Sequence, residues 1–167
     1  MYSTLGAFID DWKSESQSTL KMLDLLTDAS LGREVYPGGR TIGRLSWHIA
    51  QTIPEMMSRT GLRVSGVGEH DPVPPHAADI ASGYRAASAS LMEQLHAHWS
   101  DSTLAETDDM YGETWSRAVT LAVLIGHQTH HRGQLTVLMR QAGIVVPGIF
   151  GPAKEEWTHM GMEPPPI

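Results

Sequence analysis

The histidine pair His127 and His131 constrains this chain more than any other feature of its sequence. The two residues are spaced i, i+4, so a helix places both imidazoles on one face. That face is also apolar, because the surrounding residues at helical spacing are mostly apolar. These residues are Thr120, Val123, Leu124, Gln134, Leu135 and Leu138. Core positions that usually hold leucine are therefore predicted to hold imidazoles.

A third histidine, His48, lies on the apolar stripe of an earlier segment. The stripe consists of Leu45, His48, Ile49, Thr52 and Met56. Burying an imidazole without a polar partner is costly, because the ring loses its hydration. One divalent metal ion shared by His48, His127 and His131 would remove that cost, with water or substrate at the open position. The alternative is that each ring is a core residue hydrogen-bonded to carbonyl groups.

The residue types do not select one metal, since neutral imidazole suits zinc, nickel, copper and iron. The zincin pattern H-E-x-x-H would place glutamate at position 128, where the chain has Gln128. Metalloprotease chemistry is therefore disfavoured. The neighbouring His130 lies about 100° around the helix from His131. We expect it at the rim of the site or as a partner of a ligand.

Hydrophobic periodicity predicts four long helices, over residues 4–28, 41–59, 77–99 and 115–141. Pro54 should bend the second of these, and Gly143 is well placed to end the fourth. A short helix is expected over residues 153–159. Little strand signal is present, so the predicted fold class is all-α, a four-helix bundle. The connections between the second and third and between the third and fourth helices are long, and residues 1–167 form a single domain.

Bulk properties narrow the class of protein further. The net charge of −7 argues against a nucleic-acid partner, because such proteins usually present a basic patch. No apolar run is long enough to span a bilayer, and the N-terminus lacks the features of a signal peptide. The chain has no cysteine, which excludes disulfides, thiolate ligands and a cysteine nucleophile. We expect a cytoplasmic protein with no membrane partner.

The remaining candidate residues are expected to have lesser roles. His96 and His98 point apart on one helix, while the loop and tail hold His70, His76 and His159. The acids of the third connection should mainly be solvated, and Glu113 should lie at the favourable N-terminal end of the fourth helix. These acids are Glu106, Asp108, Asp109 and Glu113. Trp47, which precedes His48, is expected near the site.

Two segments of the chain resemble a known family. The segment 45–50, L-S-W-H-I-A, and the segment 127–135, H-Q-T-H-H-R-G-Q-L, are similar to the motifs of the DinB-like (YfiT-type) metal-dependent family. The resemblance extends over nearly the whole chain and implies the same four-helix bundle. The family's three ligands map onto His48, His127 and His131. The resemblance also implies nickel or zinc with bound water, and a homodimer.

Function follows less directly from the resemblance. Relatives include transferases that attach low-molecular-weight thiols such as bacillithiol to electrophiles, mycothiol-dependent isomerases, and proteins associated with stress. We expect a metal-dependent thiol transferase acting on a small-molecule substrate, because an open metal site can present a thiolate nucleophile. Arg44 and Arg132 are candidate anchors for the thiol's carboxylates. A metal-dependent hydrolase and a non-catalytic metal-binding or stress-response protein remain alternatives.

Overall fold

The computed structural model describes residues 1–166. The elements follow in the order α1 (Leu5–Leu23), η1 (Asp28–Ser30), α2 (Ile42–Ser58), α3 (Ala77–His98), η2 (Asp101–Ala105), β1 (Thr107–Met110), β2 (Glu113–Ser116), α4 (Arg117–Gln141) and α5 (Lys154–His159). The fold is all-α, as predicted, with one small hairpin added. No helix among the described residues has the combination of length and apolar character that crossing a membrane requires.

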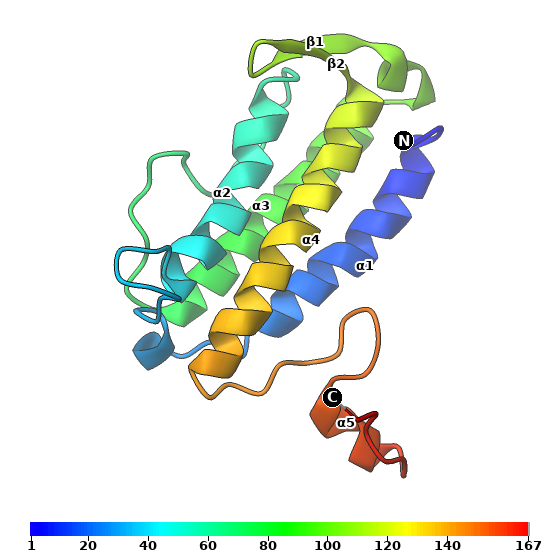
Figure 1. Cartoon of the computed structure of the whole chain (residues 1–167). Helices are drawn as coiled ribbons and strands as arrows, with labels where there is room; N and C mark the ends of the chain where they lie inside the picture. Colours follow the sequence, from blue (N-terminus) through cyan, green and yellow to red (C-terminus); the bar gives the residue numbers. More distant parts are fainter. Residues whose placement is uncertain (167) are drawn as a thin grey trace.

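The four long helices form the bundle (Figure 1). Helix α2 packs against α3 and α4, and α1 packs against the same two helices. The core between them is closed by side chains from all four helices that are completely buried, among them Phe8, Ile49, Tyr84, Leu91 and Leu124. The neighbourhood of α2 and α4 matters most for function, because these helices carry the histidines singled out by the sequence.

The C-terminal end of the first helix differs from the prediction. Helix α1 ends at Leu23, and residues 28–30 form a separate 3-10 turn, so the predicted end at residue 28 is wrong. The end of α4 is as expected. Gly143 has a φ of 76°, and the amide of Ile144 donates to the Met139 carbonyl at 2.9 Å. This left-handed glycine closes the helix in a Schellman motif.

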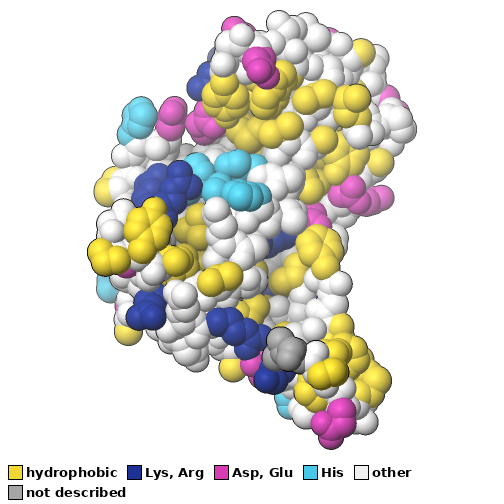
Figure 2. All heavy atoms as spheres, in the orientation of Figure 1, with side chains coloured by type: hydrophobic (Ala, Val, Ile, Leu, Met, Phe, Trp, Pro, Cys, Tyr) yellow, Lys and Arg dark blue, Asp and Glu magenta, His cyan; other side chains and the backbone are white. Residues whose placement is uncertain are grey.

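Just beyond α4 the chain still packs on the bundle through the buried Val146, whereas its last part, with the short helix α5, stands off from the bundle (Figures 1 and 2). Helix α5 spans Lys154–His159, which confirms the short helix expected in the tail. Its attachment to α4 includes an ion pair between Arg140 and Glu155.

The connection before α4 was expected to be long and polar, and the structure adds an antiparallel hairpin to it. Strand β1 pairs with β2, with Asp108 opposite Trp115. The turn residues Tyr111 and Gly112 both have positive φ, 63° and 85°. Two such residues are typical of tight hairpin turns, although a large side chain is rare in this conformation. The hairpin therefore depends on tertiary contacts as well as on its own pairing.

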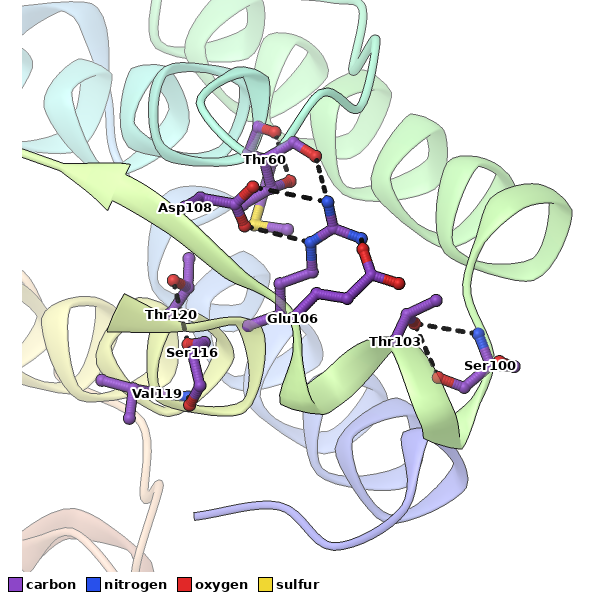
Figure 3. Close-up of polar contacts among 10 residues, drawn as sticks. Thr60, Ser100, Thr103, Glu106, Asp108, Ser116, Val119 and Thr120 are labelled. Carbon is purple, nitrogen blue, oxygen red and sulfur yellow. Dashed lines mark hydrogen bonds and ion pairs between the residues drawn. The ribbon is translucent and has the colours of Figure 1, made fainter. Parts of the chain in front are cut away.

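Arg117, the first residue of α4, supplies the principal contact of this kind. Its partners Thr60, Glu106 and Asp108 are labelled in Figure 3. Its Nε donates to Asp108 at 3.0 Å, and its Nη2 donates to the Thr60 carbonyl at 3.3 Å. It also forms an ion pair with Glu106 at 2.6 Å. Asp108 and Glu106 therefore hold the hairpin to the bundle instead of being merely solvated.

The start of α4 lies two residues later than predicted. Ser116 caps the helix by accepting a hydrogen bond from the Val119 amide at 3.3 Å. Trp115 and Glu113 lie in strand β2, so neither is helical. The expectation that Glu113 interacts with the helix dipole is wrong, since its carboxylate accepts from the Trp115 ring at 2.8 Å.

A largely buried ion pair joins α1 to α4 at Arg132, the residue that follows His131. The guanidinium of Arg132 pairs with the carboxylate of Glu15, and these side chains are 3% and 13% exposed. Arg132 also donates to the Glu15 carbonyl at 2.7 Å and to Thr129 at 3.1 Å. Removing one partner would leave a charge in a site with little access to water.

We therefore expect Glu15→Ala to lower the free energy of unfolding by roughly 3 kcal/mol or more, because Arg132 loses its counter-charge. Urea denaturation measures this loss. Asp10→Ala is the matched control on the same helix. Asp10 pairs with Lys13 at the surface, where side chains are 81% and 62% exposed. Its removal should cost less than about 1 kcal/mol. Equal losses in the two variants would contradict the assignment.

Candidate metal centre

Helices α2 and α4 bring the three predicted histidines into one cluster. One ring nitrogen from each of His48, His127 and His131 lies within 4.8 Å of the other two. The ring centroids are 5.1 Å apart for His48 and His127, 4.8 Å for His48 and His131, and 4.3 Å for His127 and His131. His131 is buried, and the other two rings are partly exposed. The arrangement can hold a metal ion.

A hydrogen bond between the two helices fixes their separation beside the cluster. Gln128 is completely buried, and its Nε2 donates to the Ile49 carbonyl of α2 at 3.0 Å. Its Oε1 accepts from Thr19 of α1 at 3.5 Å. Gln128 directly follows His127 in the sequence, and Ile49 directly follows His48. Gln128 therefore sets the distance across which the imidazoles meet.

The nitrogens are oriented for metal binding. The Nδ1–H of His131 donates to Gln134 Oε1 at 2.7 Å, which leaves the Nε2 lone pair free. That Nε2 faces the Nε2 of His127 at 3.0 Å. Two nitrogens bound to one tetrahedral zinc ion, each at about 2.0–2.1 Å, would be roughly 3.3 Å apart. The pair is thus already close to the separation that a shared ion requires.

The alternative of three core histidines bonded to carbonyls does not match this geometry. Within residues 1–166 neither His48 nor His127 donates to a carbonyl group, and the buried Nδ1 of His127 has no hydrogen-bond partner. Among the described residues, the His127 ring hydrogen-bonds only to another cluster histidine, His131. Such rings are expensive to bury unless their lone pairs are used. The donor set fits a divalent ion.

Burial also keeps the cluster in the protonation state that metal binding needs. Burial, and then the neighbouring rings, lower the pKa of His48 and of His127 to about 4. Burial lowers the pKa of His131 as well. The positive charge of Arg40 disfavours protonation of all three rings. At neutral pH the imidazoles are uncharged and can donate lone pairs.

A pocket of about 560 Å³ opens beside the cluster, with His48 and His127 in its wall. Its size falls within the usual range for small-molecule sites. The other lining residues are Arg44, Gln51, Thr52, Glu55, Met56, Glu69, His70, Tyr111, Trp115 and Val123. Figure 2 shows histidines at the surface in the middle of this face, with basic side chains on one side and hydrophobic side chains on the other. The pocket gives a ligand access to the cluster.

Glu55 is a pocket residue that the sequence analysis missed. Its carboxylate accepts from the Tyr111 hydroxyl at 2.7 Å and from Arg59 Nε at 3.0 Å. Glu55 follows His48 by seven residues, so helical spacing would have placed it on the same face. Tyr111 and Trp115 were also missed, and they reach the pocket only because the unpredicted hairpin carries them there.

Gln51, also in the pocket wall, organises the loop between α2 and α3. Its Nε2 donates to the carbonyls of Gly68 at 2.8 Å and Asp71 at 3.1 Å. Its Oε1 accepts from Arg44 Nη2 at 3.0 Å. One buried amide therefore holds the loop that carries Glu69 and His70 and also orients the Arg44 guanidinium.

Comparison with known proteins identifies the family of this chain. The profile of the DinB family, described as "DinB family", matches residues 1–165. The chain belongs to the DinB family. It is 44% identical over 165 residues to the Bacillus subtilis (strain 168) protein called "Uncharacterized protein YrdA", covering 99% of each chain. The family assignment confirms the resemblance seen in the motifs. The homodimer and the cytoplasmic location stay predictions.

Two solved DinB-like structures share the fold. The crystal structure of a DinB-like protein from Bacillus cereus ATCC 10987 has a TM-score of 0.87 and 47% identity, covering 90% of this chain and 100% of that one. A second DinB-like protein, YjoA of Bacillus subtilis, has a TM-score of 0.62 at 14% identity, covering 82% of this chain and 92% of that one. The second similarity concerns the fold alone.

Trp47 was expected near the site, and its Nε1 donates at 3.0 Å to the Asp71 carbonyl, which also accepts from Gln51 of the pocket wall. Its ring packs against Gly83 of α3 and does not line the pocket. The expectation for Arg132 in this DinB-family site is wrong. Arg132 cannot anchor a ligand's carboxylate, because it is 2% exposed and paired with Glu15. Arg44, by contrast, is exposed and lines the pocket.

The other histidines lie outside the cluster, as expected. His130 is exposed, with its ring 4.9 Å from that of His131, and it is not among the residues that can share an ion. His76 pairs with Asp28 at 2.8 Å, and His96 contacts the Met92 carbonyl at 2.7 Å. His70 lines the pocket without joining the cluster.

We expect His127→Ala to abolish stoichiometric zinc or nickel binding, because two imidazoles remain where three are needed. Elemental analysis after equilibrium dialysis measures the metal content. The matched control is His130→Ala, which removes an imidazole from the same helix but outside the cluster. This variant should retain about one ion per chain. Full occupancy in His127→Ala would show that the ion is bound elsewhere.

We also expect the metal-free protein to lose stability as the pH falls from about 6.5 to about 4. The unfolded histidines take up protons in this range while His48 and His127 stay neutral in the fold, so acid favours unfolding. Urea midpoints measured in a chelator at several pH values test this. The double variant His48→Leu, His127→Leu should show a shallower dependence, and an unchanged slope would contradict the assignment.

Proposed function

We propose that this DinB-family protein is a divalent-metal-dependent transferase that adds a low-molecular-weight thiol to an electrophilic small molecule. The observation that carries the proposal is the cluster of His48, His127 and His131 in the wall of a pocket of about 560 Å³. Three ligands leave coordination positions free, and the pocket is where a substrate atom can reach them.

The thiol must come from a second substrate, because the chain contains no cysteine. When bound, a divalent ion supplies activation by lowering the pKa of a thiol and stabilising the thiolate. The all-imidazole donor set suits nickel or zinc, and the proposal includes either metal. Because the three imidazoles are neutral ligands, they do not offset the positive charge of a bound ion. The ion would therefore favour an anionic sulfur as a further ligand.

The chain's own residues complete the thiol site. Arg44 lies one helical turn before His48 on the pocket face of α2, and Gln51 fixes its guanidinium. An exposed arginine held in this way can pair with a carboxylate of the thiol substrate. The sulfur and the carboxylate of one small thiol would then meet the cluster and Arg44 in the same pocket.

A hydrolase is the second candidate, and the position of Glu55 favours it. Hydrolysis at a metal centre needs a general base near the bound water. The Glu55 carboxylate lines the same pocket as His48 and His127. Both of its oxygens are already engaged, however, one by Arg59 and the other by the Tyr111 hydroxyl.

The proposal predicts that thioether formation from 1-chloro-2,4-dinitrobenzene requires both the metal-loaded protein and a thiol. Thiols to be tested are L-cysteine, glutathione and bacillithiol, with zinc or nickel bound, and absorbance follows the product. His127→Ala should lower the protein-dependent rate to the uncatalysed level, while His130→Ala should retain it. Metal-loaded protein that accelerates none of these reactions would contradict the proposal.

The same assay separates the alternatives. A hydrolase would consume an activated ester such as 4-nitrophenyl acetate without any thiol, and Glu55→Gln would reduce that rate by about 10²–10⁴-fold if Glu55 is the general base. A protein that binds one metal ion per chain and accelerates neither reaction would be a metal-binding protein without turnover of these substrates.

A further inference from the structure

The pocket beside the cluster has two chemically different ends along helix α2. Arg44, His48, Thr52 and Met56 follow one another at intervals of four residues, so each lies about 6 Å further along the helix axis. Arg44 is at the basic end. Met56 is at the other end, together with Val123 of α4. The metal cluster lies between a cation and an apolar wall.

The apolar wall is completed by the hairpin. Tyr111 and Trp115 both line the pocket, with ring centroids 6.0 Å apart in an edge-to-face arrangement. The Tyr111 hydroxyl donates to Glu55, and the guanidinium of Arg59 lies 4.4 Å from its ring centroid. These contacts hold Tyr111 at its rare positive φ of 63°. The two rings are therefore a fixed surface against which a flat apolar group can pack.

The charges around the pocket favour an anion at the Arg44 end. Of the two acids in the wall, Glu55 is neutralised by its ion pair with Arg59 at 3.0 Å. Glu69 is exposed on the loop, where solvent screens it. Arg44 is exposed in the same wall, and a divalent ion bound by the histidines would add further positive charge beside it.

We propose that the pocket binds a thioether that carries an anionic group at one end and an aromatic group at the other. The anionic group would pair with Arg44, the aromatic group would pack against Tyr111 and Trp115, and the sulfur would lie beside the histidine cluster. This inference rests on the proposed function, because such a thioether is the product of a transferase whose thiol bears a carboxylate and whose electrophile bears an aromatic ring.

The chemistry of the proposed step accounts for this product. The sulfur of the thiol forms a bond to a carbon of the electrophile, and the leaving group departs with its bonding electron pair. The thiol proton passes to solvent. No oxidant or reductant is needed, and the two halves of the product retain the carboxylate and the aromatic ring of the two substrates. The two ends of the pocket therefore act as specificity determinants for different substrates.

Equilibrium binding tests the inference without any turnover. The probe is (benzylthio)acetate, an unreactive thioether with both groups, and calorimetry measures its binding to the zinc-loaded protein. Two truncated probes separate the ends: benzyl methyl sulfide lacks the carboxylate, and (methylthio)acetate lacks the ring. We expect (benzylthio)acetate to bind at least roughly tenfold more tightly than either, since a buried aromatic contact and a charge-assisted contact each contribute this much.

Variants assign each preference to its residue. Arg44→Met should abolish the preference for (benzylthio)acetate over benzyl methyl sulfide. Trp115→Ala should abolish the preference over (methylthio)acetate, and Tyr111→Leu, which keeps Trp115, should reduce it. The matched controls are Arg85→Met and Trp157→Ala, at positions outside the pocket lining. Circular dichroism and zinc content establish that each variant is folded and loaded.

The outcomes distinguish this inference from the proposed function. The inference would be overturned if Arg44→Met, Trp115→Ala and Tyr111→Leu all kept the wild-type preference for (benzylthio)acetate. A carboxylate that binds only the metal ion would give this result for Arg44→Met. Preferences lost as expected would support it even if no thiol were transferred, and the proposed function alone would then fail. Thiol transfer with unaltered preferences in the variants would leave the proposed function standing and overturn the inference.

Discussion

The contact between α2 and α4 is the constraint on which both the bundle and its histidine cluster depend. Gln128 crosses this contact with a hydrogen bond to the Ile49 carbonyl, and each partner is the sequence neighbour of a cluster histidine. On the other side of α4, Arg132 is held to α1 by Glu15. Because α4 is fixed on both sides, the imidazoles cannot move apart without breaking buried polar contacts, which are costly to lose. The cluster is therefore organised before an ion binds.

This organisation also explains why the pocket is asymmetric. Along α2, successive turns carry a cation, a cluster histidine, a threonine and an apolar side chain, and the hairpin adds two aromatic rings at the apolar end. Arg117 ties the hairpin to the bundle through Asp108, so the rings are placed by contacts made outside the pocket. A metal ion bound by the cluster would lie between a basic end and an apolar end, which suits the joining of two substrates of different polarity.

The sequence was informative where helical periodicity decides the outcome. His48, His127 and His131 were found because their spacing places them on apolar faces, and Glu55 lay within reach of the same argument. The hairpin was missed because its strands are four residues each and contain Asp108 and Asp109, which have little strand preference, so Arg117 and tertiary contacts stabilise it. Periodicity assigns a residue to a helix face without showing what packs against that face, which is why Arg132 was given a wrong role. Its guanidinium is buried and paired with Glu15.

X-ray absorption spectroscopy of the zinc- or nickel-loaded protein tests the central claim most directly, because it reports the number and type of ligands around the ion. The account predicts three imidazoles from His48, His127 and His131, at about 2.0–2.1 Å for zinc, with the remaining positions taken by oxygen atoms. A spectrum with one imidazole or none would contradict the account, since the ion would then be bound away from the cluster between α2 and α4.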